Sequence, residues 1–232
     1  DWSSDVCSSD LALCLTAALL LAACGKKEDA APAGASAAAS GAASGKVYVV
    51  GTDAAYAPFE SQDEKGNLVG FSIDLMRAVA TKGGFEIRFV NTPWEGIFNA
   101  LAQGDRDIVI SSVTITDKRH ETMDFSDPYF DARQLIAVRK DSTVAKFDDL
   151  RKLQVGVQTG TTGDEVMKTL QGETSTSIKR FESTPLALKE LESGGVDAVV
   201  ADNGVVSHYV AHNTAAFKTV NDPTFEIGRA HV

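Results

Sequence analysis

The stretch LAQGDRDIVISSVTITDKR, residues 101–119, contains the pattern that decides the fold. A helix predicted over residues 95–103 ends at Gly104, and the apolar run 108–112 that follows is typical of a buried strand. A short helix then begins at residues 116–117, because Thr and Asp both favour a helix N-terminus. Helix, turn, strand and helix follow one another directly, which indicates an α/β protein.

Strands and helices alternate on both sides of this stretch. Before it, we expect strands at residues 47–52 and 85–90, with a helix at residues 72–82 between them. After it, the expected strands are residues 155–157, 178–181 and 198–202, and the expected helices are residues 163–170, 185–193 and 205–212. This alternation predicts a parallel-type α/β sheet.

Two segments of the chain resemble each other. LAQGDRDIVISS at residues 101–112 aligns with LESGGVDAVVAD at residues 191–202. The alignment places Ser112 and Asp202 at equivalent strand ends, where open α/β sheets bind ligands. Each of two lobes would then contain one such unit, although chance similarity between two units also fits. The expected parts are residues 46–133 for the first lobe, 134–139 for a crossing hinge strand and 140–226 for the second lobe.

The composition is that of a soluble globular protein, with 44% hydrophobic and 23% charged residues among 232. A formal charge of -10 and the lack of clustered Lys and Arg argue against a nucleic-acid partner. The three cysteines are Cys7, Cys14 and Cys24, so the region after Cys24 can form no internal disulfide. Its histidines show no metal-ligand spacing or catalytic partner, and we expect neither a metal nor a cofactor.

Residues 11–24 resemble a bacterial lipoprotein signal, a short apolar segment that ends in LAACG. In that class of protein the chain is cut before the cysteine, and Cys24 would carry the lipid. A buried Ala/Leu helix with a core cysteine is the alternative interpretation. Residues 25–45 are mostly Ala, Ser and Gly, a composition that buries too little apolar surface to fold, so we expect a flexible linker.

Both ends of the chain are expected to be non-native sequence derived from an adapter, over residues 1–11 and 227–232. DNA that can encode DVCSSD at residues 5–10 encodes IGRAHV, the last six residues, when it is read on the opposite strand. The same double-stranded DNA would then flank the insert in opposite orientations. Coincidence is the alternative.

The segment TITDKR, residues 114–119, has the features of a carboxylate site. Arg119 offers a planar guanidinium that can bind a carboxylate through two hydrogen bonds, and free N–H groups at a helix start add donors. The Gly-rich run QTGTTG at residues 158–163 also opens a helix, and it lacks the Gly-Lys-Ser/Thr of a nucleotide-binding loop. It could equally be a loop with a Thr cap, and Arg119 a solvated side chain paired with an acid.

Together with FSDPY at residues 125–129, TITDKR resembles the extracellular solute-binding proteins of polar amino-acid importers, family 3. The resemblance covers nearly all of residues 46–225. It implies a type II periplasmic-binding-protein fold, in which two lobes joined by a hinge enclose a ligand cleft. Members of the family complete the first lobe with C-terminal helices, so we expect this chain to be truncated at its C-terminus.

The resemblance also implies which residues hold the two charged groups of an amino acid. Arg119 would bind the α-carboxylate, helped by the backbone N–H of Thr114 and by Thr161. Asp202 would pair with the α-ammonium, supported by Ser112 and the hydroxyl of Thr114. A carboxylate is needed there, because a desolvated ammonium without a counter-charge is costly. For Asp202, a strand-end turn or cap is the alternative role.

Four further residues would surround the ligand side chain. Tyr56 and Trp94 match aromatic residues that sandwich it, although aromatic residues are more often part of a core. Asp53 and Gln158 would face its far end, where Asp53 favours an amide or cationic group. Ser72 stands where several cation-binding members of the family carry Asp, which argues against a cationic ligand without excluding one.

The implied function is the substrate-binding component of an ABC transporter for a polar or basic L-amino acid. We expect a monomer that binds the free amino acid and the importer permease, without nucleic acid or catalysis. The expected location is periplasmic or at the cell surface, with a lipid anchor as the sole attachment to a bacterial membrane. The alternatives are a dehydratase-type enzyme on the same fold, which would need a general acid or base, and the ligand-binding domain of an amino-acid sensor.

Overall fold

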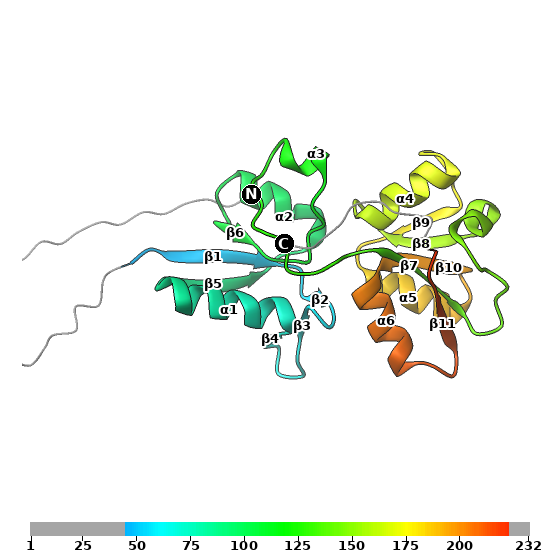
Figure 1. Ribbon diagram of the computed structural model, residues 1–232, viewed down its shortest axis with the longest axis horizontal. Helices are drawn as coiled ribbons and strands as arrows, with labels where there is room; N and C mark the ends of the chain where they lie inside the picture. Colours follow the sequence, from blue (N-terminus) through cyan, green and yellow to red (C-terminus); the bar gives the residue numbers. More distant parts are fainter. Residues whose placement is uncertain (1–44, 223–232) are drawn as a thin grey trace, which may run out of the picture. The chain divides into compact units, whose positions relative to one another are not determined.

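The computed structural model describes residues 45–222. It is an α/β structure with two larger sheets and one small antiparallel sheet (Figure 1). The strands and helices expected within this range are present, with small shifts at their ends. The expected strand 108–112 differs most, because its sheet pairing covers only Ile108–Val109. The expectations for the lipoprotein signal, Cys24, the linker up to residue 44 and the adapter-derived ends lie outside the described residues.

The first sheet has three parallel strands in the order β5-β1-β6. They are β1 (Val47–Thr52), β5 (Glu86–Asn91) and β6 (Ile108–Val109), connected through helices α1 (Phe71–Gly83) and α2 (Trp94–Ala102). Val50, Met76 and Ile110 form a buried cluster between these strands and α1. Parallel pairing places the carboxyl ends of β1 and β6 at the same edge of the sheet.

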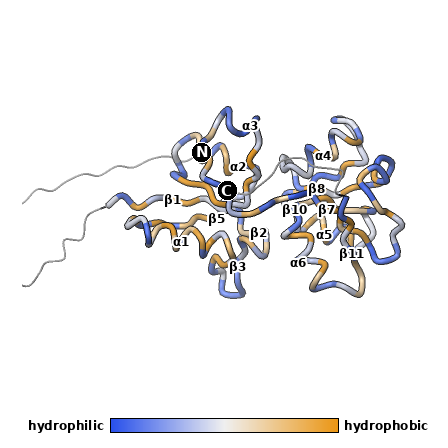
Figure 2. The backbone as a smooth tube through the Cα atoms, in the orientation of Figure 1, coloured by the Kyte–Doolittle hydropathy of each residue, from blue (hydrophilic) through white to orange (hydrophobic). Residues whose placement is uncertain are grey.

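A small antiparallel sheet follows β1, and the sequence analysis did not predict it. Its strands are β2 (Ala55–Tyr56), β3 (Glu60–Gln62) and β4 (Leu68–Val69). The hydrophilic turn between β3 and β4 is ordered by Asp63, whose carboxylate accepts hydrogen bonds from the N–H groups of Lys65 and Asn67 (Figure 2). Strands of two or three residues are too short to show a period of two in the sequence.

The second sheet has five strands in the order β11-β7-β10-β8-β9. They are β7 (Gln134–Arg139), β8 (Val155–Gln158), β9 (Ile178–Phe181), β10 (Ala198–Asp202) and β11 (Phe217–Val220). Strands β8, β9 and β10 are parallel, whereas β7 runs antiparallel to β10 and β11. The expected hinge strand, residues 134–139, is therefore a member of this sheet. The lobe boundaries and the hinge role of this segment stay predictions.

Helices cover both faces of the second sheet. They are the 3-10 helix η1 (Phe147–Lys152), α4 (Thr162–Gln171), α5 (Thr184–Ser193) and α6 (Asn203–His212). Alternate residues of β7 face opposite core clusters: Ile136 packs with residues of η1 and α4, and Ala137 with residues of α5 and α6. Because both faces are covered, β7 and β10 are buried on both sides and consist mainly of hydrophobic residues.

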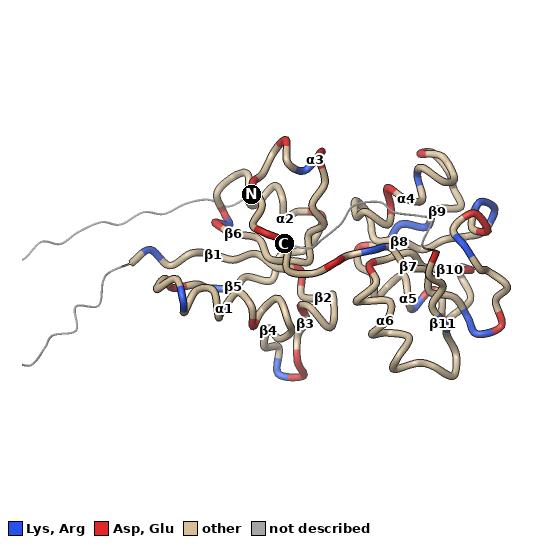
Figure 3. Tube along the Cα trace, in the orientation of Figure 1, with Lys and Arg blue, Asp and Glu red and all other residues tan. Residues whose placement is uncertain are grey.

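Acidic and basic residues are interspersed over residues 45–222, as in the turn between β3 and β4 (Figure 3).

The remaining helix, α3 (Asp117–His120), begins where the sequence predicted, at an N-cap formed by Thr116. No helix within these residues is long and apolar enough to cross a membrane.

Candidate functional site

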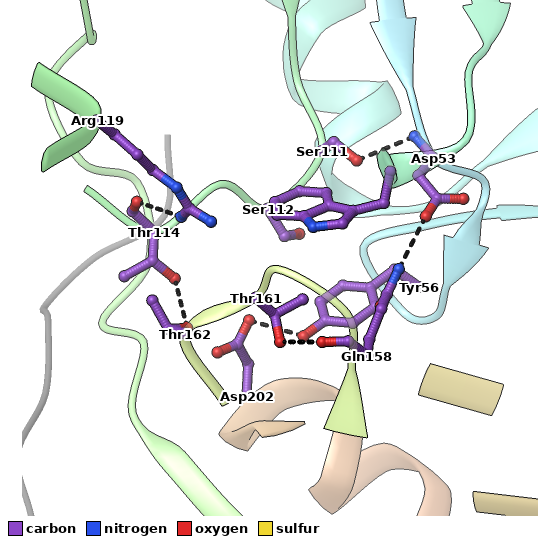
Figure 4. Close-up of a pocket in the computed structure, with 11 residues that line it drawn as sticks. Asp53, Tyr56, Ser111, Ser112, Thr114, Arg119, Gln158, Thr161, Thr162 and Asp202 are labelled. Carbon is purple, nitrogen blue, oxygen red and sulfur yellow. Dashed lines mark hydrogen bonds between the residues drawn. The ribbon is translucent and has the colours of Figure 1, made fainter. Parts of the chain in front are cut away.

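All nine predicted ligand-binding residues line one pocket of about 310 Å³ (Figure 4). They are Asp53, Tyr56, Trp94, Ser112, Thr114, Arg119, Gln158, Thr161 and Asp202. The structure adds Ser111 and Thr162 to the lining.

The pocket lies at the carboxyl ends of parallel strands from both larger sheets. Asp53 directly follows β1, and Ser112 follows β6 after the chain has left the first sheet. Gln158 is the last residue of β8, and Asp202 is the last residue of β10. The backbone of Ser112 has a φ of 49°, in a left-handed region that side chains rarely adopt. Open α/β sheets commonly bind ligands at such strand ends.

Arg119 is held in place by backbone carbonyl groups and aromatic rings. Its Nη1 donates to the carbonyl oxygen of Thr114 at 2.7 Å, and its Nη2 donates to that of Gly160 at 3.4 Å. The guanidinium carbon lies 5.4 Å from the ring centroid of Trp94 and 5.3 Å from that of Phe98. Burial lowers the pKa of Arg119, and the negative charge of Asp202 opposes that shift. The pocket therefore contains a fixed guanidinium with neutral direct partners.

Asp202 enters the pocket from a different side (Figure 4) and is 5% exposed. Its Oδ2 accepts a hydrogen bond from the hydroxyl of Tyr56 at 2.7 Å, and its Oδ1 accepts one from Nε2 of Gln134 at 2.5 Å. Burial and the nearby Asp202 carboxylate raise the pKa of Tyr56, so its hydroxyl keeps the proton that it donates. Both of these described donors to Asp202 are neutral groups.

Asp53 and Gln158 contact each other at another part of the pocket. Nε2 of Gln158 donates to Oδ2 of Asp53 at 3.2 Å, and Oε1 of Gln158 accepts from the hydroxyl of Thr184 at 2.9 Å. The N–H of Asp53 donates to Oγ of Ser111 at 2.9 Å. Burial raises the pKa of Asp53, and the bond from Gln158 opposes this shift. The pair therefore offers one acidic and one amide group to a ligand.

Three threonines stand where the two sheets approach. The hydroxyls of Thr114 and Thr162 are 3.4 Å apart. Thr161 is the N-cap of α4: its Oγ1 accepts from the N–H of Asp164 at 3.4 Å and donates to the carbonyl oxygen of Gln158 at 2.8 Å. Thr161 therefore has the capping role that the sequence left open, and it also lines the pocket.

Sequence reasoning missed several polar residues at or behind the pocket. Ser111 and Thr162 are the chain neighbours of two predicted residues, and that adjacency was the signal available for them. Gln134 reaches Asp202 because the two residues are register partners on β7 and β10, which the sequence does not reveal. Glu60 is fully buried on the unpredicted strand β3.

The lining supports binding of a charged molecule. Its described residues combine one guanidinium, two carboxylates and two aromatic rings, and they include no histidine or cysteine. Among residues 45–222, no group of three or more His, Cys, Asp or Glu side chains is arranged to hold a metal ion. A cation at one place and anions at others suit a ligand that itself carries separated charges.

Comparisons with known proteins point in the same direction. The sequence model for bacterial extracellular solute-binding proteins, family 3, matches residues 48–221. A probable histidine-binding protein of Neisseria gonorrhoeae is 50% identical over 215 residues, which cover 90% of this chain and 77% of that protein. The arginine-binding extracellular protein ArtP of Bacillus subtilis is 33% identical over 203 residues, covering 88% and 74% of the two chains.

Solved structures show the same fold. The arginine-, lysine-, histidine-binding protein ArtJ of Geobacillus stearothermophilus matches with a TM-score of 0.77 at 42% identity, covering 80% of each chain. An ancestral arginine-binding protein bound to arginine matches with a TM-score of 0.74 at 41% identity, covering 80% of this chain and 82% of the other. An ancestral arginine-binding protein bound to glutamine matches with a TM-score of 0.73 at 41% identity, covering 80% of this chain and 82% of the other.

Proposed function

Because the chain belongs to the bacterial extracellular solute-binding proteins of family 3, we propose that it binds one free L-amino acid in this pocket. It would serve as the substrate-binding component of an ABC importer. The relatives described above are named as binding proteins rather than enzymes, and we propose binding without turnover.

The observation that carries this proposal is the placement of Arg119 and Asp202 in one pocket. The two side chains act on each other electrostatically, and each hydrogen bond described for them joins them to a neutral group: Arg119 donates to backbone carbonyl oxygens, and Asp202 accepts from a hydroxyl and an amide. An amino acid carries a carboxylate and an ammonium that match these two groups. The α-carboxylate would bind Arg119 and the N–H groups near Thr114, and the α-ammonium would bind Asp202.

The ligand side chain would extend toward Asp53 and Gln158, between the rings of Tyr56 and Trp94. An acidic and an amide group favour a side chain rich in hydrogen-bond donors. Relatives named for arginine and histidine support a basic ligand, although Ser72 argued against one. We therefore propose a polar or basic amino acid, with basic side chains favoured by Asp53.

Ligand binding would close two lobes, residues 46–133 and 140–226, about the segment 134–139. Several hydrogen bonds already link the two groups of residues in this structure, and four of the described contacts involve pocket residues. They are Tyr56 with Asp202, Gln158 with Asp53, Thr114 with Thr162, and Arg119 with Gly160. In the closed complex, ligand groups would replace or extend these bonds, which couples affinity to closure.

The proposed partners are the amino acid and the permease of the importer, with the protein acting as a monomer. Family 3 proteins are extracellular, which supports a periplasmic or cell-surface location. A lipid on Cys24 would provide the anchor to the bacterial membrane.

Isothermal titration calorimetry with each of the twenty amino acids tests the proposal. We expect one or a few polar or basic amino acids to bind with a stoichiometry of one. Arg119→Ala should weaken binding by roughly 2 to 5 kcal/mol, because the ligand carboxylate would lose its charged partner. Arg77→Ala is the matched control, since Arg77 is exposed on α1 and pairs with Asp74. Equal affinity of the Arg119→Ala and wild-type proteins would refute the assignment.

A further inference from the structure

Glu60 is a carboxyl group buried next to the pocket that the proposed binding reaction does not use. It is the first residue of β3 and is 0% exposed. Neither of its carboxyl oxygens has a hydrogen-bond partner among the described residues, and the same is true of the hydroxyl oxygen of the pocket residue Ser112. An ionised carboxylate without a partner is costly in such a place, so the geometry favours the protonated acid.

The charged groups around Glu60 also favour its protonated form. The carboxylates of Asp53, after β1, and Asp202, at the end of β10, both disfavour its ionised form. The hydroxyls of Ser72 and Ser112 lie near Glu60 without forming a hydrogen bond to it, and they favour the ionised form, but burial outweighs them and raises the pKa of Glu60 to about 8. Among residues 45–222, the hydroxyls of Tyr56 and Tyr129 are two further titratable groups that interact with Glu60. Burial raises the pKa of both tyrosines, so they stay neutral.

A positively charged ligand would reverse this balance. Asp53 and Asp202 act on Glu60 as negative charges, so a cation bound against either carboxylate acts on it in the opposite sense. The α-ammonium and α-carboxylate of any amino acid largely cancel each other. A cationic side chain near Asp53 adds one net positive charge, and it makes ionisation of Glu60 easier.

We propose that Glu60 is a specificity-determining residue that holds a proton in the ligand-free site and releases it when a cationic amino acid binds. The O–H bond of the carboxyl group breaks, and the proton passes to solvent buffer. The new carboxylate then contributes to the attraction of the ligand. An amino acid with a neutral side chain leaves the proton in place and lacks that contribution. This inference rests on the proposed binding of amino acids.

Proton release is measured by titrating the protein with arginine and with glutamine at pH 7, in buffers of different ionisation enthalpy. We expect the heat for arginine to depend on the buffer, corresponding to release of on the order of half a proton or more per site. The heat for glutamine should not depend on the buffer. Glu60→Gln should abolish the release for arginine and narrow the affinity ratio between the two amino acids. Glu64→Gln, on the exposed turn of the same sheet, is the matched control.

The outcomes separate this inference from the proposed function. Absence of binding by any amino acid overturns the proposed function. Four results would each overturn the role of Glu60. They are binding of neutral amino acids only, heat for arginine and lysine that does not depend on the buffer, equal proton release with glutamine, and proton release that persists in Glu60→Gln. If the variant does not fold, infrared difference spectra of the wild type decide. Arginine should remove the band of a buried protonated carboxyl group, and an unchanged band contradicts the proposal.

Discussion

The hydroxyl of Tyr56 donates to Oδ2 of Asp202 at 2.7 Å, which connects β2 to β10 across the pocket. Burial keeps the tyrosine neutral, so the bond is a charge-assisted one between a neutral donor and a carboxylate. This contact joins β2, which the sequence did not predict, to the end of β10, which it did predict.

Tyr56→Phe removes this bond while it keeps the aromatic ring. Because Asp202 is buried, loss of one donor should lower the free energy of unfolding by roughly 1 to 3 kcal/mol. Urea denaturation followed by circular dichroism measures the change. Tyr48→Phe, on β1 and outside the pocket, is the control and should stay near the wild-type value. An equal loss in both variants would mean that the effect is not specific to the bond with Asp202.

Asp202→Asn tests the countercharge for the α-ammonium. The amide keeps the shape of the side chain and can still accept from Tyr56, but it leaves the ammonium without a negative partner. Affinity for the bound amino acid should fall by roughly 2 to 5 kcal/mol in calorimetry. Asp148→Asn, in an exposed pair with Arg151, should bind as the wild type does. Unchanged binding by Asp202→Asn would show that the ammonium is held elsewhere.

Sequence periodicity predicted the longer elements of this fold because each has one consistent pattern. Strands β7 to β10 of the second sheet and helices α4 to α6 follow the expected positions closely, whereas β11 and η1 were not predicted. The same reasoning missed β2, β3 and β4, whose two or three residues are held by pairing with one another rather than by a local pattern. The secondary structure of this part of the chain is therefore determined by tertiary pairing.

The residues of the candidate site likewise fall into two groups, those that the sequence predicts and those that it does not. Arg119 and Asp202 stand in motifs or at strand ends that can be recognised along the chain. Gln134 meets Asp202 only through the antiparallel register of β7 and β10. Glu60 approaches the pocket only through the small sheet. Residues that support a site from behind depend on the three-dimensional fold, and a single sequence does not reveal them.

The ionisation of Glu60 should make the free energy of unfolding depend on pH. Its pKa is raised from the ordinary 4.5 to about 8 in the folded protein, so the folded state binds this proton more tightly than the unfolded state does. The contribution of this proton to the free energy of unfolding is fully present below pH 4.5 and is lost as the pH rises toward 8. Relative to Glu60→Gln, the wild type should lose about 3 kcal/mol between pH 5 and pH 8. Urea denaturation at both pH values measures this, and parallel profiles of the two proteins would contradict the buried acid.

Gly163→Ala tests how closely α4 must approach β10 to place Thr161 and Thr162 in the pocket. A Cβ atom at residue 163 would lie 2.8 Å from the carbonyl oxygen of Val200 and 3.1 Å from Oε1 of Gln134. Backbone must then move, which should destabilise the protein by roughly 1 to 3 kcal/mol and weaken amino-acid binding. Gly96→Ala, within α2, meets no atom within 4 Å and should be neutral or stabilising, because Ala favours a helix. Equal stability of both variants in urea would show that the start of α4 can move away from β10 at little cost.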